Sequence, residues 1–363
     1  MIKILFIGES WFGSCARSLK EALARQPQVE LDEISEDSFF PNHRAKWLRG
    51  VHRILHSAYK AELYNQILSR VSVFKPDYFV VYKGHSFDAA FIRQLQLQGV
   101  QTVNVYPDYS PHAYGDTHKE AVGEYDLVIS TKPFHRSLWQ TVYGYSNACN
   151  FVPQGYDPTL HLVPTFPVSQ PFDVALVATW RPEYGDLFKR LAVLLAGHGV
   201  KVAIGGNGWV QRRDEFPADW IFVGGLQGRS YIEWLRQGKI CIAPVTREVL
   251  INGERQPGDE DTTRTYELAA AHCFFIHRRT DYVKSLYDEV KEVPLYETPE
   301  GLAEKILYYL QHPEERALMA TRAHQRVVPA YSLDTRANAI VAVLQEQLAS
   351  DGKSQVIKPA SVP

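Results

Sequence analysis

The residues whose types and spacing best suit chemistry lie in one stretch, GDEDTTRTYELAAAHCFFI, from Gly258 to Ile276. A polar loop there leads into a short helical pattern and then into an apolar strand. Asp261, Thr262 or Thr263 can cap the helix, and the start of a capped helix presents amide groups and a positive dipole end to an anion. Arg264 adds a planar fork of hydrogen-bond donors that suits a phosphate. The stretch therefore predicts an anion-binding loop.

Glu267 follows Arg264 by about one helical turn. Its carboxylate can accept two hydrogen bonds from a ribose diol. The alternative is that Arg264 and Glu267 form a surface pair at i,i+3, which contributes only about 0.2–0.5 kcal/mol. The spacing alone slightly favours the surface pair.

Further phosphate and nucleotide contacts are predicted earlier in the same half of the chain. Arg181 follows the apolar run Asp173–Thr179, where a phosphate-binding side chain is useful. Gly206, Asn207 and Gly208 follow another apolar run, and the two glycines would let the backbone approach a nucleotide. The alternative for these three residues is a simple turn after a strand.

A second group of polar residues lies in the N-terminal half. Asp108 and His112 fall in VNVYPDYSPHAY (Val103–Tyr114) and could act as a general base for an acceptor hydroxyl or hold a donor sugar. The alternative is an aspartate that caps a turn and a solvated histidine. Lys83 and His85 end the preceding strand and are predicted to line the same wall as acceptor-binding residues.

Apolar runs alternate with amphipathic helical patterns on both sides of a proline-rich segment, Pro153–Pro171. This alternation predicts an α/β protein with two Rossmann-like, doubly wound domains facing a cleft. We expect an N-terminal acceptor-binding domain over 1–160, a C-terminal nucleotide-sugar donor-binding domain over 170–335, a helix at 336–349 that packs back on the first domain, and a tail at 350–363. Ligands of open α/β sheets bind beyond the carboxyl ends of the strands, so the crevice between the domains is the expected active site.

The strand predictions rest on short apolar runs that end in glycine, proline or a polar turn. They are Ile2–Gly8, Tyr78–Tyr82, Thr102–Tyr106 and Leu127–Ser130 in the first half, and Asp173–Thr179, Lys201–Gly206, Trp220–Gly225, Lys239–Val245 and Cys273–His277 in the second. Helices are predicted at Cys15–Arg25 and Asp186–Gly197.

The stretch TTRTYELAAAHCFFI resembles a segment of the CgeB-like glycosyltransferases, which belong to the large GT-B group with the family-4-type enzymes. The resemblance continues in YETPEGLAEKILYYLQHPEERALMATRAHQRV (Tyr296–Val327), and backwards through FDVALVATW, GGNGW and KICIAPV. It also covers KPDYFVVYKG, VNVYPDYSP, STKPF and VPQGYDPTLH in the N-terminal half, so it spans nearly the whole chain in order. Each motif is weak alone, and their order and spacing are more specific than any one of them.

The resemblance implies roles for several residues. A glutamate at the position of Glu267 binds the donor ribose, and Arg264 would face the diphosphate. The family often has a second glutamate where this chain has Asp259, whose shorter side chain weakens the expected contact with the donor sugar. Such enzymes need no divalent metal, because arginines and a helix terminus stabilise the leaving diphosphate. Asp259, Glu260 and Asp261 form a DxD string, but it lies in a loop before a helix, so no metal site and no separate cofactor are predicted.

Composition narrows the remaining choices. The formal net charge is -2 at pH 7, so no overall field favours nucleic acid. The four cysteines are widely spaced and form no CxxC pair, and the N-terminus lacks a signal-peptide pattern, which predicts a cytoplasmic protein. Residues 44–63 form a basic amphipathic helix that could touch a membrane or an anionic acceptor, although packing on its own sheet is the more common use of such a helix.

The sequence therefore predicts a metal-independent glycosyltransferase that moves a hexosyl or related sugar from a nucleotide-sugar, UDP- or GDP-linked, to an acceptor hydroxyl. The acceptor could be a glycan, a lipid-linked saccharide or a small molecule. The alternatives are a sugar-nucleotide epimerase, which shares the architecture, and a non-catalytic protein that binds sugar nucleotides. A Rossmann oxidoreductase is disfavoured because the first turn, GESWFGS (Gly8–Ser14), has no GxGxxG.

Overall fold

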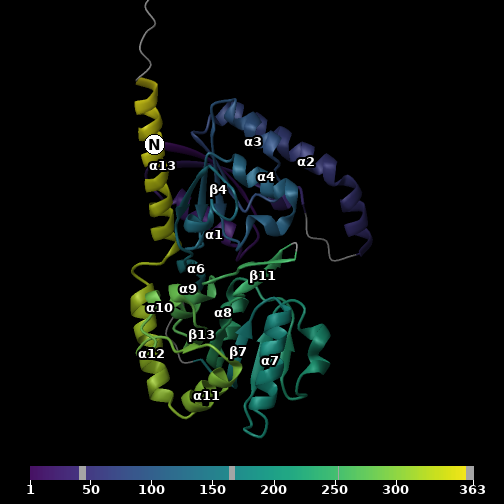
Figure 1. Cartoon of the computed structure of the whole chain (residues 1–363), viewed down its shortest axis with the longest axis vertical. Coiled ribbons are helices and arrows are strands. Elements are labelled where there is room, and N and C mark those ends of the chain that lie inside the picture. The colour runs from purple at the N-terminus through teal and green to yellow at the C-terminus, as the bar shows by residue number, and fades with distance from the viewer. Residues whose placement is uncertain (41–45, 163–167, 252, 357–363) are drawn as a thin grey trace, which may run out of the picture. The chain divides into compact units, whose positions relative to one another are not determined.

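The computed structural model describes residues 1–40, 46–162, 168–251 and 253–356, with the backbone alone at 46–54 and 350–356. The chain divides into two compact units (Figure 1). Unit 1 comprises Met1–Pro153 and Leu333–Pro363, and unit 2 comprises Gln154–Ser332. The predicted N-terminal domain ends at residue 160, and the structure places its last residues, 154–160, in unit 2.

Unit 1 is built on a parallel sheet whose strand order is β2-β1-β3-β4-β5-β6. The strands are β1 (Ile2–Gly8), β2 (Val29–Ser35), β3 (Tyr78–Tyr82), β4 (Gln101–Tyr106), β5 (Leu127–Ser130) and β6 (Ala148–Phe151). The order reverses between β1 and β3, because β2 lies on one side of β1 and all later strands lie on the other. In doubly wound sheets, ligands bind at such a switch point.

Helices cover both faces of the first sheet. They are α1 (Cys15–Ala24), α2 (Lys46–Phe74), α3 (Ala89–Gln96), α4 (Asp116–Glu124), α5 (His135–Leu138) and α13 (Leu333–Val356), with the short 3-10 helices η1 (Glu36–Ser38) and η2 (Pro111–Tyr114). One core joins strand residues to α2 and α3, and the other joins them to α1 and α13. Within the second core, the Tyr78 hydroxyl donates to the Leu344 carbonyl at 2.6 Å, which ties the last helix to the sheet.

Unit 2 contains a second parallel sheet, in the order β14-β13-β10-β7-β8-β9. Its strands are β7 (Phe172–Val177), β8 (Val202–Gly205), β9 (Ile221–Val223), β10 (Gly238–Ala243), β13 (Phe275–Arg278) and β14 (Leu295–Tyr296). The switch point is between β7 and β10, because β8 and β9 lie on one side and the later strands on the other. The two sheets confirm the predicted α/β class with two Rossmann-like, doubly wound domains.

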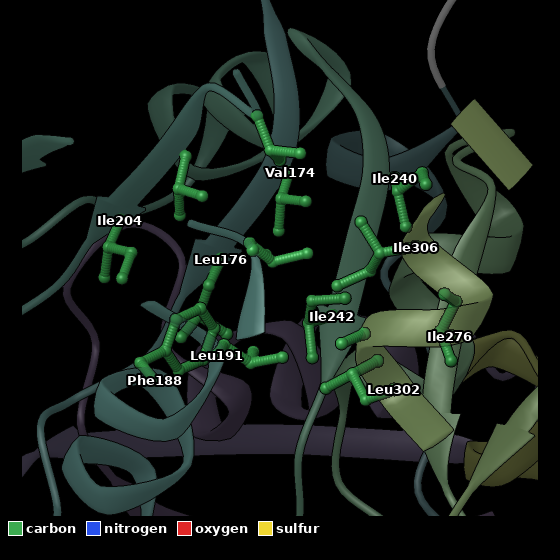
Figure 2. Close-up of a cluster of buried hydrophobic side chains, with 14 of the residues drawn as sticks. Val174, Leu176, Phe188, Leu191, Ile204, Ile240, Ile242, Ile276, Leu302 and Ile306 are labelled. Carbon is green, nitrogen blue, oxygen red and sulfur yellow. The ribbon is translucent and has the colours of Figure 1, made fainter. Parts of the chain in front are cut away.

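The core on one face of this sheet is formed by side chains from the strands and from two helices (Figure 2). Val174, Leu176, Ile204, Ile240, Ile242 and Ile276 from the strands meet Phe188 and Leu191 of α7 and Leu302 and Ile306 of α11. Continuous apolar strands are what a parallel sheet covered on both faces requires.

The remaining helices of unit 2 are α6 (Pro158–His161), α7 (Pro182–Leu194), α8 (Arg229–Arg236), α9 (Arg264–Ala270), α10 (Asp281–Leu286), α11 (Pro299–Leu310) and α12 (Pro313–Val327), with the 3-10 helix η3 (Val210–Glu215). Residues of α8, α9, α10 and α12 form the core on the opposite face. The functional stretch identified in the sequence thus lies on α9, between the sheet and α12.

Three edge strands, one hairpin and the end of the last helix were not predicted from the sequence. The strands β2, β6 and β14 were missed, since all three lie at sheet edges; β2 (VELDEIS) is also rich in acidic residues. The antiparallel hairpin of β11 (Glu248–Ile251) and β12 (Glu254–Pro257) lies in a polar stretch that lacks an apolar run. The last helix, α13, continues to Val356, beyond the expected start of a tail at 350. Proline, the usual helix breaker, does not occur there before Pro359.

The predicted basic helix lies within α2. Residues 44 and 45 and the side chains of Arg49 and Arg53 fall outside the described part of the structure. Lys60 is paired with Asp88 at 2.8 Å, so this cation is already engaged by its own unit. Among the described residues, no helix is both long and apolar enough to cross a membrane.

Candidate functional site

The loop that leads into α9 is fixed to the end of β10 by its backbone. Gly258 donates to the Arg247 carbonyl at 2.8 Å, and Asp259 donates to the Thr246 carbonyl at 2.6 Å. A Cβ atom at Gly258 would lie 2.0 Å from the Thr246 oxygen, so only glycine fits. The loop therefore holds the start of α9 at the carboxyl edge of the sheet.

The three residues predicted to cap α9 differ in their contacts. Thr263 is the N-cap residue, but its side chain accepts no cap hydrogen bond. Asp261 is fully buried and accepts from the Tyr266 hydroxyl at 2.8 Å. The Thr262 amide donates to the Thr265 hydroxyl at 3.1 Å, while the Thr262 hydroxyl is buried with no hydrogen-bond partner among the described residues.

Glu267 is buried, with 8% of its surface exposed. The Tyr231 hydroxyl, from α8, donates to its Oε2 at 2.7 Å. His161 Nε2 lies 3.6 Å from its Oε1. Burial and the neighbouring Glu267 charge raise the pKa of Tyr231 well above its usual value. The phenol therefore stays protonated and can donate a hydrogen bond to the Glu267 carboxylate.

Sequence reasoning missed His161 and Tyr231. Asp157 caps α6, and its amide donates to His161 Nδ1 at 2.9 Å, which orients the imidazole. The signal was present in the motif DPTLH, because an N-cap followed by proline predicts a helical turn that ends on the histidine. Nothing in the local sequence places that turn against α9.

Arg264 lies at the switch point of the second sheet. Its guanidinium donates to the carbonyl of Val177, the last residue of β7, at 3.4 Å, and to that of Pro244, just after β10, at 3.3 Å. Its Nε is buried without a hydrogen-bond partner among the described residues. The alternative of a surface pair between Arg264 and Glu267 is wrong, because Glu267 is buried and held by Tyr231 and His161.

The predicted glycine turn is required by close backbone packing. A Cβ atom at Gly206 would lie 1.9 Å from the Ala178 oxygen, and the residue has a φ of 130°. The Gly206 amide donates to the carbonyls of both Val223 and Gly224. Asn207 accepts from the Trp180 amide at 2.8 Å. The turn therefore joins the ends of β7, β8 and β9, and this packing accounts for Gly206 without a ligand.

The other predicted donor-binding positions in unit 2 are more open. Arg181 is exposed and is the N-cap residue of α7. Gly208 has a φ of 88° and would bring a Cβ atom within 3.0 Å of the Trp180 side chain. Asp259 is half-buried. The structure brings Arg264 and Glu267 onto one helix of this edge.

A pocket of about 920 Å³ lies in unit 2 at the same edge of the sheet. Its walls come from the start of α7, the residues after β10, the hairpin of β11 and β12, and the ends of β13 and β14. Pro244 belongs to the pocket and also accepts from Arg264, so the guanidinium lies next to it. Pockets of this size hold small-molecule ligands and cofactors.

In unit 1, the structure brings Lys83, His85 and Asp108 together. Lys83 has a φ of 67°, a left-handed conformation that non-glycine residues rarely adopt, and its carbonyl accepts from Asn104 at 3.0 Å. His85 Nε2 lies 3.6 Å from Asp108 Oδ2. Burial lowers the pKa of His85, and Asp108 opposes that shift.

His112 points to different neighbours. Its ring lies 5.3 Å from the Tyr143 ring and 6.1 Å from the Tyr145 ring, between centroids. Burial lowers its pKa. The described contacts of Asp108 and His112 therefore do not form one acid–base pair.

Sequence reasoning also missed His118, which lies edge-on to His85 with 4.6 Å between the ring centroids. It is buried, neither ring nitrogen has a hydrogen-bond partner among the described residues, and burial lowers its pKa to about 4. It is a neutral aromatic wall behind His85. Its position on a mostly polar helix (DTHKEAVGE) gives no sequence signal for this placement.

No group of three or more histidine, cysteine, aspartate or glutamate side chains is arranged to hold a metal ion in the parts of the chain that the structure describes. Arg264 and Arg181 are the cations predicted for the site from the sequence, and Arg247, Arg255 and Arg278 line the adjacent pocket.

Comparisons with known proteins agree with this architecture. A family described as "Glycosyl transferase-like" matches residues 185–342, which include Asp259, Arg264 and Glu267. The chain thus contains a glycosyltransferase-like domain. No curated protein sequence matches the chain significantly.

Solved structures are similar over nearly the whole chain. Sucrose-phosphate synthase from Thermosynechococcus elongatus is 14% identical, with a TM-score of 0.67 over 96% of this chain and 100% of that one. Anabaena HepE in complex with UDP-glucose is 13% identical, with a TM-score of 0.67 over 95% of this chain and 100% of that one. UDP-GlcNAc 2-epimerase from Neisseria meningitidis bound to UDP-GlcNAc is 10% identical, with a TM-score of 0.54 over 95% and 100%. At these identities the similarity shows the fold, which is GT-B.

Proposed function

We propose that the protein is a CgeB-like glycosyltransferase that transfers a sugar from a nucleotide-sugar to an acceptor hydroxyl without a divalent metal. The observation that carries the proposal is Glu267: a buried carboxylate on α9, inside the glycosyltransferase-like domain, at the carboxyl edge of a doubly wound sheet. Solved structures of the same fold have been determined with UDP, UDP-glucose or UDP-GlcNAc. UDP-sugars are therefore the first donors to test, and GDP-sugars the second.

In this proposal unit 2 binds the donor. Glu267 accepts from the ribose hydroxyls, and Tyr231 and His161 hold its carboxylate in place. Arg264 and Arg181 face the diphosphate, with Thr262, Thr263, Asn207, Gly206 and Gly208 lining the approach. Fixed positive groups stabilise the charge that the diphosphate gains as it leaves, which is the function a metal ion has in other transferases.

Unit 1 would bind the acceptor through Lys83 and His85. The Asp108 carboxylate takes the proton from the acceptor hydroxyl as its oxygen bonds to the anomeric carbon, and the bond from that carbon to the diphosphate oxygen breaks. His112 is a weaker candidate for this step, because its described contacts lie with Tyr143 and Tyr145 rather than with Asp108. The cytoplasmic location and the membrane contact through residues 44–63 remain predictions.

The test is a panel of UDP-, GDP- and dTDP-sugars, scored by thermal stabilisation with and without EDTA. A ligand at 100 times its Kd stabilises the native state by about 2.7 kcal/mol. We expect one nucleotide to stabilise the protein equally well with EDTA. Turnover that stops in EDTA and returns with magnesium or manganese would overturn metal independence.

An epimerase is the second candidate, because a UDP-GlcNAc 2-epimerase shares the fold over nearly the whole chain. The two functions differ in what happens to the nucleotide-sugar when no acceptor is present. An epimerase converts the best UDP-sugar to its epimer with no acceptor present, whereas a transferase consumes it rapidly only when an acceptor is added. Proton NMR of the nucleotide-sugar distinguishes the outcomes.

A further inference from the structure

Unit 1 has a pocket of about 320 Å³ that the sequence did not indicate. It lies beyond the carboxyl ends of β1, β2 and β3, since its walls include Glu9 after β1, Glu36 and Asp37 after β2, and Lys83 and His85 after β3. The switch point of this sheet is between β1 and β3, so the pocket is where an open α/β sheet binds its ligand. Its volume is enough for a small molecule such as a monosaccharide derivative.

The pocket contains a carboxyl group without a full set of partners. Oε1 of Glu36 is buried with no hydrogen-bond partner among the described residues. Leaving a buried hydrogen-bond acceptor unpaired costs about 1–3 kcal/mol of folding free energy, and more for a charged group. Such an atom in a native structure therefore calls for an explanation. A ligand that donates a hydrogen bond to Glu36 Oε1 would provide that explanation.

The charges around Glu36 define which donor fits. The pKa of this carboxyl is raised to about 7, mainly by burial and also by the Glu9 and Asp37 charges, while a hydrogen bond from Ser86 and the Lys83 charge oppose the shift. Glu9 and Asp37 have partners of their own: Glu9 accepts from the Trp11 indole at 3.0 Å, and Asp37 accepts from the Ser10 amide at 2.7 Å.

The other titratable groups of the pocket are His56, Tyr82 and His85. His85 lies 3.6 Å from Asp108 and Tyr82 keeps its proton, because burial raises its pKa. The carboxylates thus outnumber the fixed positive charges, of which Lys83 is the only one among the described lining residues. A positively charged group near Glu36 Oε1 would relieve both the missing hydrogen bond and the repulsion.

We propose that this pocket binds a small polyhydroxylated ligand through a primary ammonium group, with the Glu36 carboxylate as its anchor. An ammonium group donates three hydrogen bonds, and its positive charge would balance the negative charge of the three carboxylates. A metal ion fits less well, since no metal-ligating group of three side chains occurs in the described part of the chain. If the ligand is the acceptor of the transfer reaction, a step that rests on the proposed function, the enzyme glycosylates an amino sugar or another amine-bearing polyol.

The test compares two probes that differ in one group: 2-aminoethyl β-D-glucoside, whose alkylammonium stays charged from pH 6 to 8, and 2-hydroxyethyl β-D-glucoside, which is neutral. Both are titrated into the full chain by calorimetry. We expect the amine to bind at least about tenfold more tightly than the alcohol, the ratio typical of one charge-assisted hydrogen bond. Binding should tighten from pH 6 to 8 as Glu36 loses its proton, and at pH 7 it should release about half a proton, seen by comparing two buffers.

Glu36→Gln removes the charge and keeps the shape, so it should abolish the preference for the amine and the proton release. Glu62→Gln, at an exposed position of α2, is the matched control and should change neither. Equal binding of the two probes, absence of binding by both, or an unchanged preference in Glu36→Gln would overturn the proposal.

A UDP titration of the same proteins keeps this proposal separate from the proposed function. Glu36→Gln should bind UDP like the wild type, because the residue is in unit 1. If the amine binds and UDP does not, the pocket stands and the transferase assignment fails. If UDP binds and neither probe does, the proposed amine-binding pocket fails and the transferase assignment stands.

Discussion

The two units place opposite charges at equivalent points of similar sheets. In unit 2 the switch point between β7 and β10 is spanned by the Arg264 guanidinium, which donates to a carbonyl at the end of each strand. In unit 1 the switch point between β1 and β3 opens into a pocket lined by Glu9, Glu36 and Asp37. In the two proposals above, the same backbone arrangement binds an anion in one unit and a cation in the other. On this basis the side chains that follow the strands, rather than the fold, would determine which ligand binds.

The units also differ in how completely their carboxylates are paired. Glu267 receives a hydrogen bond from Tyr231 and faces His161, so its geometry is fixed before any ligand arrives. Glu36 has a buried oxygen with no partner among the described residues. A preorganised group loses little freedom on binding, whereas an unpaired one gains a missing partner.

The largest effect is expected from Gly206→Ala, which tests whether the edge of unit 2 is as rigid as the packing indicates. The new Cβ would lie 1.9 Å from the Ala178 oxygen in a conformation with a φ of 130°. We expect a loss on the order of 3 kcal/mol or more in the free energy of unfolding. Gly224→Ala is the control, since a Cβ there meets nothing within 4 Å, and it should change stability by under about 0.5 kcal/mol. Equal denaturation midpoints would show that the backbone can yield.

The next largest effect is expected from Glu267→Ala. Loss of a charged partner to the ribose should weaken UDP binding by about 2–4 kcal/mol, or tens-fold and more. The melting temperature should fall as well, because the Tyr231 hydroxyl loses its acceptor, which costs about 1–3 kcal/mol. This differs from what a surface pair would predict, namely an almost unchanged melting temperature.

Tyr231→Phe separates the two consequences. It removes the hydroxyl but leaves the Glu267 carboxylate, so it should reduce stability and retain UDP binding within a few-fold. Calorimetric titration with UDP and melting curves on the same samples give both quantities. Wild-type UDP affinity in Glu267→Ala would place the donor site elsewhere.

Much of the fold was predictable, because short stretches of sequence are enough to identify a buried strand. Buried parallel strands are continuous apolar runs, so most central strands, such as β1 and β7, could be located to within a few residues. Edge strands such as β2 are half polar and do not stand out. The residues of the candidate site could be proposed from the sequence only where one segment carries them. Arg264 and Glu267 share a helix, whereas His161 and Tyr231 reach Glu267 from separate elements, a tertiary contact that no local pattern encodes.

The pH dependence of stability tests the unpaired carboxyl of unit 1. Glu36 holds its proton up to about pH 7 in the folded protein but only to about 4.5 when unfolded. Its contribution is therefore fully present below pH 4.5, is lost as the pH rises to about 7, and is constant above that. The difference amounts to about 3 kcal/mol.

Glu36→Gln has no proton to lose, so it should be more stable than the wild type at pH 8 and show little advantage at pH 4.5. Urea unfolding of both proteins between pH 4 and 8, with Glu62→Gln alongside, measures the difference. A gap between wild type and Glu36→Gln that stays constant with pH would mean that the folded carboxyl titrates normally.

The smallest effect is expected from Asp259→Ala, and it distinguishes contact with the sugar from contact with the nucleotide. Asp259 is tied to Thr246 through its backbone amide, which the substitution keeps, so the loop should hold its position. Its side chain is one methylene shorter than the glutamate that the resemblance implies at this place. We expect UDP to bind as in the wild type, and the proposed donor, tested as UDP-glucose, to bind less tightly by under about 1 kcal/mol. Asp259→Glu restores the longer side chain and should strengthen UDP-glucose binding with no change for UDP. If Asp259→Ala weakens UDP itself, the residue acts on the nucleotide or on the loop, and the inference of a sugar contact from the family resemblance fails.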